Sequence, residues 1–318
     1  MASATTSVAA VLTGLSGSDF LSSADTTAQQ TAALLQLATQ LKRGERRIDL
    51  GNRVLGLIFT KASTRTRVSF QVAMARLGGQ TVDLNPQLTQ LGRGEPLEDT
   101  ARVLSRFCDV LAIRTFAQQE LADYAHWASI PVINALTDLE HPCQALADVL
   151  TMQEACGDLQ GQTLAYVGAG NNVAHSLMLC GALLGVNVRI GCPEGFEPLP
   201  GVVDQARALS VGGAQISVIT DPVEAVRGAQ ALYTDVWASM GQEQEQAERE
   251  RAFQGFCLNE DLLAEADSRA IVLHCLPAHR GEEISAGVME GPSSRIFDQA
   301  ENRLHAQQAL LAALLGGL

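Results

Sequence analysis

Apolar and polar positions along the chain follow two different periods. Between Asp25 and Lys42, apolar residues recur at the three-to-four spacing that predicts a helix. From Val54 onward, short continuous apolar runs alternate with stretches of helical spacing. The first half gives predicted strands near 54–59, 80–84, 109–113 and 131–133, and predicted helices near 65–77, 97–107 and 119–127. Such alternation is typical of a parallel sheet covered by helices.

The same organisation starts again after one long helix. That helix is predicted to begin at Pro142 and to close at Gly157, because proline suits a first helical turn and glycine suits the residue after the last one. Predicted strands follow near 163–167, 186–190, 215–219, 230–233 and 270–274, with helices near 173–184 and 202–210. The predicted fold class is α/β, with two doubly wound parallel-sheet domains joined by interdomain helices. Ligands are expected at the carboxyl ends of the strands.

Composition narrows the function classes. With 318 residues, 47% of them hydrophobic, the chain has enough material for two cores, yet no apolar run approaches the ~18 residues that a membrane span needs. A formal charge of −13 argues against binding to nucleic acid. The seven scattered cysteines lack C-x-x-C spacing, and residues 1–14 do not resemble a targeting peptide. We therefore expect a cytoplasmic protein that contacts neither membrane nor nucleic acid.

The segment from Ser63 to Arg67, Ser-Thr-Arg-Thr-Arg, is separated from the first predicted strand by three residues and opens a predicted helix. Free backbone N–H groups at a helix start, several hydroxyls and a guanidinium converge there, which suits a phosphate group. The simpler interpretation is an ordinary helix cap with an arginine that pairs at the surface. A phosphate-bearing small molecule would need such a local basic site in an otherwise acidic chain.

His141-Pro142-Cys143-Gln144 opens the long predicted helix. Proline at the first helical position places His141 at the cap, with Gln144 three residues further on toward the same side. Their N–H groups are donors suited to a carbonyl or an amide, although a capping histidine beside a structural glutamine is the plain alternative.

His274-Cys275-Leu276-Pro277 follows the apolar strand 270–273, so Cys275 is expected at the carboxyl end of a strand. A small buried cysteine is the alternative. Two dipeptide-like pairs, His141 with Cys143 and His274 with Cys275, lack the spacing of a zinc site, and we expect no metal.

Gly168-Ala-Gly170-Asn171-Asn172-Val173 has some likeness to a dinucleotide-binding turn. Valine occupies the third glycine position of that motif, and no acidic residue ends the next predicted strand. The two asparagines suit an amino-acid head group better than a pyrophosphate. A nicotinamide-dependent oxidoreductase therefore remains only an alternative.

Taken together, these segments resemble the aspartate/ornithine transcarbamylase family, and most closely its ornithine carbamoyltransferases. The resemblance covers nearly the whole chain. It rests on Ser-Thr-Arg-Thr-Arg at 63–67, Gln90-Leu-Gly-Arg-Gly-Glu, Ile113-Arg114, His-Pro-Cys-Gln at 141–144, Asn171-Asn172, Asp-Val-Trp-Ala-Ser-Met-Gly at 235–241, His-Cys-Leu-Pro at 274–277 and Glu301-Asn-Arg303. Several such strings in the family's order are far more specific than any one of them.

The resemblance implies that the two domains bind different substrates. Residues 1–146, with the terminal helix 303–318 packing back, would bind carbamoyl phosphate, and residues 147–302 would bind L-ornithine. The implied carbamoyl-phosphate residues are Ser63, Thr64, Arg65, Thr66, Gln90, Arg114, His141, Gln144, Cys275, Leu276 and Arg303. The implied ornithine residues are Asn172, Asp235, Ser239 and Met240. Within these sets, Arg114, His141 and Cys275 would be catalytic.

The expected reaction is transfer of the carbamoyl group to the side-chain amine of L-ornithine, a step of arginine metabolism that gives citrulline and phosphate without a metal or organic cofactor. A homotrimer or a multiple of trimers is usual in the family, with Gln90 reaching from a neighbouring subunit. The polar segment 241–251 would fold over the amino-acid substrate. Asp235 favours a cationic amino acid over aspartate, whereas putrescine and acetylornithine remain alternative acceptors. A non-catalytic amino-acid-binding protein is a further alternative, but it would leave the Ser63–Arg67 loop without a purpose.

Overall fold

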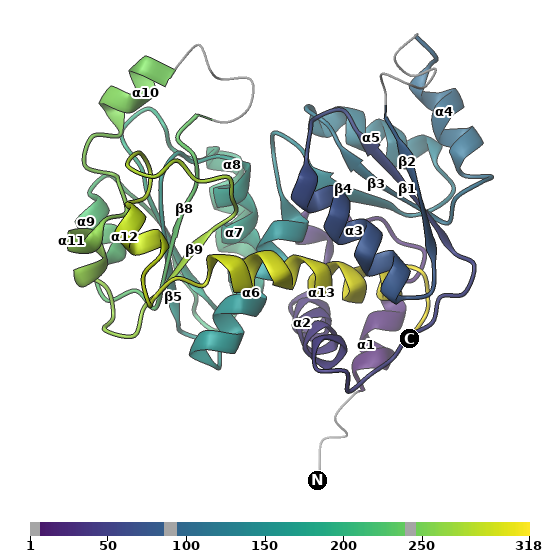
Figure 1. The fold of residues 1–318 in the computed structure, drawn as a ribbon, viewed down its shortest axis with the longest axis horizontal. Helices are drawn as coiled ribbons and strands as arrows, with labels where there is room; N and C mark the ends of the chain where they lie inside the picture. Colours follow the sequence, from purple (N-terminus) through teal and green to yellow (C-terminus); the bar gives the residue numbers. More distant parts are fainter. Residues whose placement is uncertain (1–6, 86–93, 239–245) are drawn as a thin grey trace. The chain divides into compact units, whose positions relative to one another are not determined.

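The computed structural model describes residues 7–85, 94–238 and 246–318. They form two compact units, one of residues 1–146 with 303–318 and the other of residues 147–302. The division falls inside two long helices, α6 (Pro142–Cys156) and α13 (Ile296–Leu314). Both units are α/β, and each contains one sheet in which every paired strand is parallel (Figure 1). The predicted fold class is therefore confirmed.

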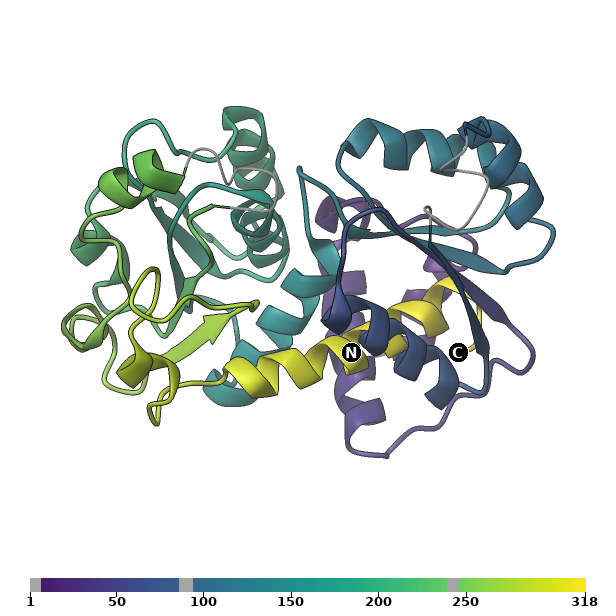
Figure 2. The ribbon, with the colours of Figure 1, turned by 45° about the horizontal axis from the view of Figure 1, so that its top comes forward.

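The first unit is built on four strands in the order β2-β1-β3-β4. These strands are β1 (Val54–Phe59), β2 (Gln80–Leu84), β3 (Val110–Arg114) and β4 (Val132–Leu136). Their connections carry α3 (Thr64–Arg76), α4 (Leu97–Leu104) and α5 (Gln118–Trp127). Figures 1 and 2 show α3 on one face of the sheet and α4 with α5 on the other. Strand β3 is buried throughout, as the continuous apolar run predicts.

Helices near the chain termini complete this unit. α1 (Val8–Leu12) packs against α2 (Ala28–Lys42), and two short 3₁₀ turns, Thr13–Leu15 and Ser23–Asp25, lie in the segment between them. Phe20 pairs in parallel with Ile133 of β4, which extends the sheet by one bridge. The late residues of α13 are almost all buried, so this part of the helix belongs to the core of this unit.

The second unit has five strands in the order β7-β6-β5-β8-β9. They are β5 (Thr163–Val167), β6 (Asn187–Gly191), β7 (Ile216–Ile219), β8 (Ala231–Thr234) and β9 (Ile271–His274). The helices are α7 (Asn172–Leu183), α8 (Pro200–Leu209), α9 (Pro222–Val226), α10 (Gln246–Ala252), α11 (Glu260–Ala264) and α12 (Ala286–Met289). Strand order reverses at β5, because the chain proceeds from it to β6 on one side and returns to β8 on the other.

Boundaries and short helices depart from the sequence predictions. α4 ends at Leu104 instead of 107, and β4 continues to Leu136 instead of stopping at 133. The helices α9, α11 and α12 were not predicted, because each has only four or five residues and too little periodic pattern to recognise. The long helix α6 ends at Cys156, directly before Gly157, whose φ of +84° suits glycine.

Candidate functional site

The start of α3 is organised by Ser63, its N-cap residue. The Ser63 hydroxyl accepts a hydrogen bond from the backbone N–H of Thr66 at 3.3 Å. Thr64, Arg65 and Thr66 are the first three residues of the helix, and β1 ends only four residues before Ser63. The 13-residue helix presents the positive end of its dipole at this point. A helix start directly after a buried strand is a favourable place for an anion.

Adjacent strands bring further groups to the same edge of the sheet. Arg114 is the last residue of β3 and pairs in register with Phe59, the last residue of β1. The register with β4 shifts between Ile113 and Arg114, an irregularity that redirects a side chain at a strand end. Thr60 donates to the Arg114 carbonyl from its backbone N–H and its hydroxyl, at 2.9 and 3.0 Å. Arg114 is therefore held beside the segment that leads into α3.

His141, Gln144 and Arg303 lie in the same unit. His141 directly precedes α6, and its carbonyl accepts from the backbone N–H of Gln144 at 3.0 Å. All three side chains are buried. Arg303, on α13, donates from Nη2 to the Thr66 hydroxyl at 2.6 Å. This contact joins positions 237 residues apart and places a guanidinium at the first turn of α3.

Burial and three arginines determine the charge state of His141. Burial, and then the positive charges of Arg303, Arg114 and Arg65, lower the pKa of this imidazole well below its usual value. A neutral ring carries one N–H donor and one acceptor nitrogen at neutral pH. The first unit therefore contains a site where three guanidinium charges surround a neutral imidazole, within a chain whose formal charge is −13.

Two other basic side chains near this loop have partners. Lys61 is buried, pairs with Asp138 at 2.6 Å and lies 3.8 Å from the centre of the Phe116 ring. Arg67 pairs with Asp83 of β2 and lies over the Phe59 ring. Arg67 therefore connects α3 to the sheet, although it belongs to the same Ser-Thr-Arg-Thr-Arg string.

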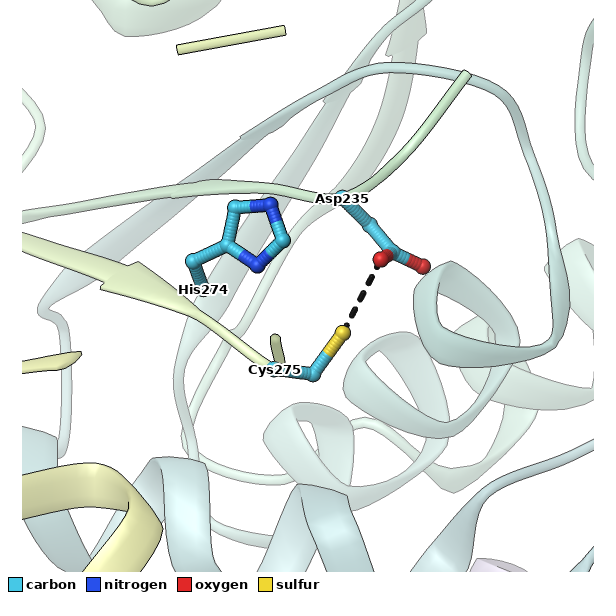
Figure 3. A group of neighbouring side chains, drawn as sticks. All are labelled: Asp235, His274 and Cys275. Carbon is cyan, nitrogen blue, oxygen red and sulfur yellow. Dashed lines mark hydrogen bonds between the residues drawn. The ribbon is translucent and has the colours of Figure 1, made fainter. Parts of the chain in front are cut away.

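The second unit gathers a different set at the carboxyl ends of β5, β8 and β9. Asp235 follows β8 and is buried, and Cys275 follows β9. The Cys275 thiol donates to Asp235 Oδ1 at 3.0 Å (Figure 3). The backbone N–H of Val236 donates to the same oxygen at 2.9 Å. Asn171, which follows the β5 turn, donates from Nδ2 to Asp235 Oδ2 at 2.9 Å. Three neighbouring strand ends thus position one carboxylate.

The carboxylate controls the thiol in turn. Burial, and then the negative charge of Asp235 and its hydrogen bond, raise the pKa of Cys275 well above its usual value. The thiol therefore keeps its proton at neutral pH and acts as a donor to Asp235. A thiolate nucleophile is unfavourable in this environment.

His274 is fixed by the backbone that follows it. The N–H of Leu276 donates to His274 Nδ1 at 2.8 Å, so Nδ1 is the acceptor nitrogen of the ring. The other nitrogen, Nε2, then carries the hydrogen and donates to Glu283 Oε1 at 3.1 Å. Ligand atoms of Asp235, His274 and Cys275 lie within 4.8 Å of one another, a spacing compatible with a metal ion. Both nitrogens of His274 are already engaged, so the group fits a metal poorly.

Gly170 allows the β5 turn to pack closely. A Cβ atom at this position would lie 2.0 Å from the backbone nitrogen of Pro198 and 2.4 Å from the carbonyl carbon of Glu197. Only glycine fits here, which explains the Gly-x-Gly spacing without a dinucleotide. Asn171 then caps α7 by accepting from the backbone N–H groups of Val173 and Ala174 at 3.0 and 3.1 Å.

The described candidate residues are divided between the two units. Ser63, Thr64, Arg65, Thr66, Arg114, His141, Gln144 and Arg303 belong to the first unit, and Asn172, Asp235, Cys275 and Leu276 belong to the second. Gln90, Ser239 and Met240 lie outside the described residues. Sequence reasoning missed the link from Asn171 to Asp235. The available signal was that asparagine directly before a helix is a preferred cap, whose side chain is held in place.

No helix among residues 7–85, 94–238 and 246–318 has the length and apolar character that a membrane crossing requires. The two sites together define a class of two-domain α/β proteins, with a guanidinium-rich site in one domain and a carboxylate-centred site in the other.

Two family profiles match consecutive parts of the chain. The family profile "Aspartate/ornithine carbamoyltransferase, carbamoyl-P binding domain" matches residues 18–154, and "Aspartate/ornithine carbamoyltransferase, Asp/Orn binding domain" matches residues 160–314. The chain belongs to the aspartate/ornithine carbamoyltransferase family.

Individual relatives extend over almost the entire chain. The ornithine carbamoyltransferase of Prochlorococcus marinus strain MIT 9313 is 84% identical over 98% of both chains. That of Parasynechococcus marenigrum strain WH8102 is 81% identical over the full length of both. Among solved structures, ornithine carbamoyltransferase from Pyrococcus furiosus matches with a TM-score of 0.92 and 48% identity, over 96% of this chain and 99% of that one.

Proposed function

We propose that this protein transfers the carbamoyl group of carbamoyl phosphate to the side-chain amine of L-ornithine, which gives L-citrulline and phosphate. The family profiles and the relatives named ornithine carbamoyltransferase support this activity. The structural observation that carries the choice of acceptor is the buried carboxylate of Asp235, held by Asn171 and Cys275. A fixed negative charge suits an ammonium group and repels the dicarboxylate aspartate.

Carbamoyl phosphate is proposed to bind at the start of α3. Ser63, Thr64, Arg65 and Thr66 would bind its phosphate group through hydroxyls, backbone N–H groups and one guanidinium. Arg303, already hydrogen-bonded to Thr66, would add a second positive charge. Gln90, Cys275 and Leu276 complete the proposed set, and Gln144 would bind the carbamoyl amide.

Arg114 and His141 are the proposed catalytic groups for the carbonyl. Attack by the amine builds negative charge on the carbamoyl oxygen, and each donor already aimed at that oxygen typically lowers the barrier by about 3–4 kcal/mol. Arg114 supplies a permanent positive charge. His141 stays neutral among the arginines, so its N–H acts as a hydrogen-bond donor. Neither group has to give up a proton for this role.

Ornithine is proposed to bind in the second unit. Asp235 would accept the α-ammonium group, with Asn172, Ser239 and Met240 contacting the rest of the amino acid. Cys275 would position the side-chain amine. The pattern favours a free α-amino group, which distinguishes ornithine from acetylornithine and putrescine. The charged segment that includes α10 is proposed to cover this substrate.

The acceptor amine must lose a proton before or during attack. A lysine-like pKa near ~10.4 makes the neutral amine scarce, and supplying it from water at pH 7 costs about 4.6 kcal/mol. The Cys275 thiol is itself protonated because its pKa is raised, so it is unsuitable as the base. The departing phosphate is the proposed proton acceptor. Turnover with ornithine is then expected to rise between pH 7 and pH 9.

A homotrimeric assembly and a cytoplasmic location are parts of the same proposal. The seven cysteines are free, which fits a reducing compartment. Sedimentation of the purified protein tests the assembly directly, with a monomer as the contradicting result.

The deciding experiment measures carbamoyl transfer from carbamoyl phosphate to ornithine, putrescine, acetylornithine and aspartate. Ornithine is expected to give the highest kcat/KM, and aspartate none. The Arg114→Ala variant is expected to lose at least a hundredfold in kcat, the typical effect of removing one such donor. Arg102→Ala is the matched control, because Arg102 is an exposed arginine of α4 in the same unit.

Two results would contradict the proposal. Putrescine or acetylornithine as the preferred acceptor would remove the role of Asp235. Near-normal activity of Arg114→Ala would remove the role of that guanidinium.

A further inference from the structure

A turn beyond the Cys275 segment gathers three potential metal ligands. Residues His279 to Glu282 form a tight turn in which the backbone N–H of Glu282 donates to the His279 carbonyl at 3.0 Å. The turn brings the two side chains to one side, with His279 Nδ1 3.6 Å from Glu282 Oε2. Glu283 follows, and its Oε2 lies 3.9 Å from the same imidazole nitrogen. One atom from each residue lies within 4.8 Å of the others.

Glu283 is the unusual member of this cluster. Its side chain has no exposed surface, and its Oε1 accepts from His274 Nε2 at 3.1 Å and from the His279 backbone N–H at 2.6 Å. The other oxygen, Oε2, is buried without any hydrogen-bond partner. A buried carboxylate oxygen without a donor is costly, and native structures rarely leave one without a reason. This oxygen faces His279 and Glu282.

The spacing is close to that of a coordination sphere. Metal–ligand distances of about 2.1 Å in a tetrahedral arrangement separate the ligand atoms by roughly 3.4 Å. The observed separations of 3.6 and 3.9 Å need only small movements. Side chains of His279 and Glu282 are about half exposed, so their rotamers can adjust. Glu283 is held in place by its two hydrogen bonds through Oε1.

We propose that His279, Glu282 and Glu283 bind one divalent metal ion of the zinc class through Nδ1, Oε2 and Oε2. One imidazole and two carboxylates suit such an ion, and the exposed side of the turn leaves room for water as a further ligand. The site is separate from the Asp235–Cys275 pair and is independent of the carbamoyl-transfer proposal. It is linked to the functional site through Glu283, whose other oxygen accepts from His274.

Calorimetric titration of the full-length protein with Zn²⁺ tests the site. A Cys275→Ser background removes the accessible soft ligand at the neighbouring cluster. This variant is expected to bind one Zn²⁺ per chain, and the added His279→Gln or Glu282→Gln substitution is expected to raise the Kd at least tenfold. His126→Gln is the matched control, because His126 is an exposed histidine on α5 of the other unit. It should leave the Kd unchanged.

Thermal unfolding provides a second readout. Zn²⁺ should raise the midpoint of Cys275→Ser and of its His126→Gln derivative, because an ion that binds only the folded chain stabilises it. The His279→Gln derivative should show a smaller increase at the same Zn²⁺ concentration. Equal Zn²⁺ affinity with and without His279→Gln, or no binding to Cys275→Ser, would overturn the proposal.

Discussion

Replacing Asn171 with aspartate tests how the second unit holds its carboxylate. In the native protein, Asn171 Oδ1 caps α7, while Nδ2 donates to Asp235 Oδ2 at 2.9 Å. The Asn171→Asp substitution has almost the same shape and retains the capping oxygen. It replaces the donor by a second carboxylate oxygen that faces the first one. The variant therefore changes the charge at one partly buried contact without creating a cavity.

The loss of stability depends on whether both carboxylates stay charged or one of them takes up a proton. Two carboxylate charges 2.9 Å apart repel by about 6 kcal/mol at an effective dielectric constant of ~20. Protonating one of them at pH 7, from a reference pKa near ~3.9, costs only about 4 kcal/mol and restores a donor. The pair therefore holds one proton, and the variant is about 4 kcal/mol less stable at pH 7.

This penalty depends on pH in a defined direction. The folded pair has a raised pKa, so the variant matches the native protein at pH values below about 4, where the unfolded carboxyl is protonated as well. The penalty then grows by about 1.4 kcal/mol per pH unit until the repulsion limit is reached near pH ~8. Between pH 5 and pH 7 the difference in unfolding free energy should widen by roughly 3 kcal/mol.

Urea unfolding of both proteins at one protein concentration, followed from pH 5 to pH 8, measures the difference. The double variant Asn171→Asp with Asp235→Asn is the control, because it exchanges donor and acceptor and removes the second charge. It should regain most of the lost stability. A single variant whose penalty does not change with pH, or a double variant no more stable than the single one, would refute this account of Asp235.

Three further predictions concern Gly170, His141 and Cys275. Gly170→Ala should lower the unfolding free energy by about 3 kcal/mol or more, because the added Cβ would lie 2.0 Å from backbone. Gly201→Ala is the control, because a Cβ on this α8 residue would meet open space. Equal urea midpoints for the two variants would contradict this prediction. Because the pKa of His141 is lowered in the folded state, only the unfolded state binds a proton at this imidazole below pH ~6.5. The unfolding free energy should therefore fall by up to about 2 kcal/mol between pH ~6.5 and pH ~5. His141→Gln should remove this part of the acid sensitivity, as measured by unfolding at several pH values. Burial is the first cause of the raised pKa of Cys275, and the Asp235 carboxylate adds to it. Asp235→Asn should therefore speed alkylation of Cys275 by iodoacetamide at pH 8, measured by mass spectrometry, and an unchanged rate would exclude a contribution of the carboxylate.

The strands and the strand-end site residues could be predicted because they follow from a local pattern. A continuous apolar run predicts a buried parallel strand, and the parallel-sheet rule then places the residue after it at the ligand edge. That reasoning placed Cys275 from the sequence alone. Arg114 came from the family resemblance, yet it ends a buried strand for the same physical reason. The exact ends of the helices depend on tertiary packing, so the predicted helix ends were less accurate.

Contacts between distant segments had no such local signal. The hydrogen bond from Arg303 to Thr66 spans most of the chain, and only the family resemblance pointed to Arg303. Glu283 belongs to a charged turn that looks like ordinary surface, yet packing leaves its side chain no exposed area. Contacts between residues far apart in the chain form only when the core is folded, so the local sequence pattern cannot reveal them.

The two sites use the same physical device with opposite signs. In the first unit, burial and then fixed guanidinium charges lower the pKa of His141 and keep it neutral, so the net charge offered to a ligand is positive. In the second unit, burial and then Asp235 raise the pKa of Cys275 and keep the thiol protonated, so the carboxylate remains the dominant charge. Each titratable neighbour thereby becomes a donor whose protonation is constant around pH 7. The pH dependence of the proposed reaction should then reflect the ornithine amine instead of either protein group.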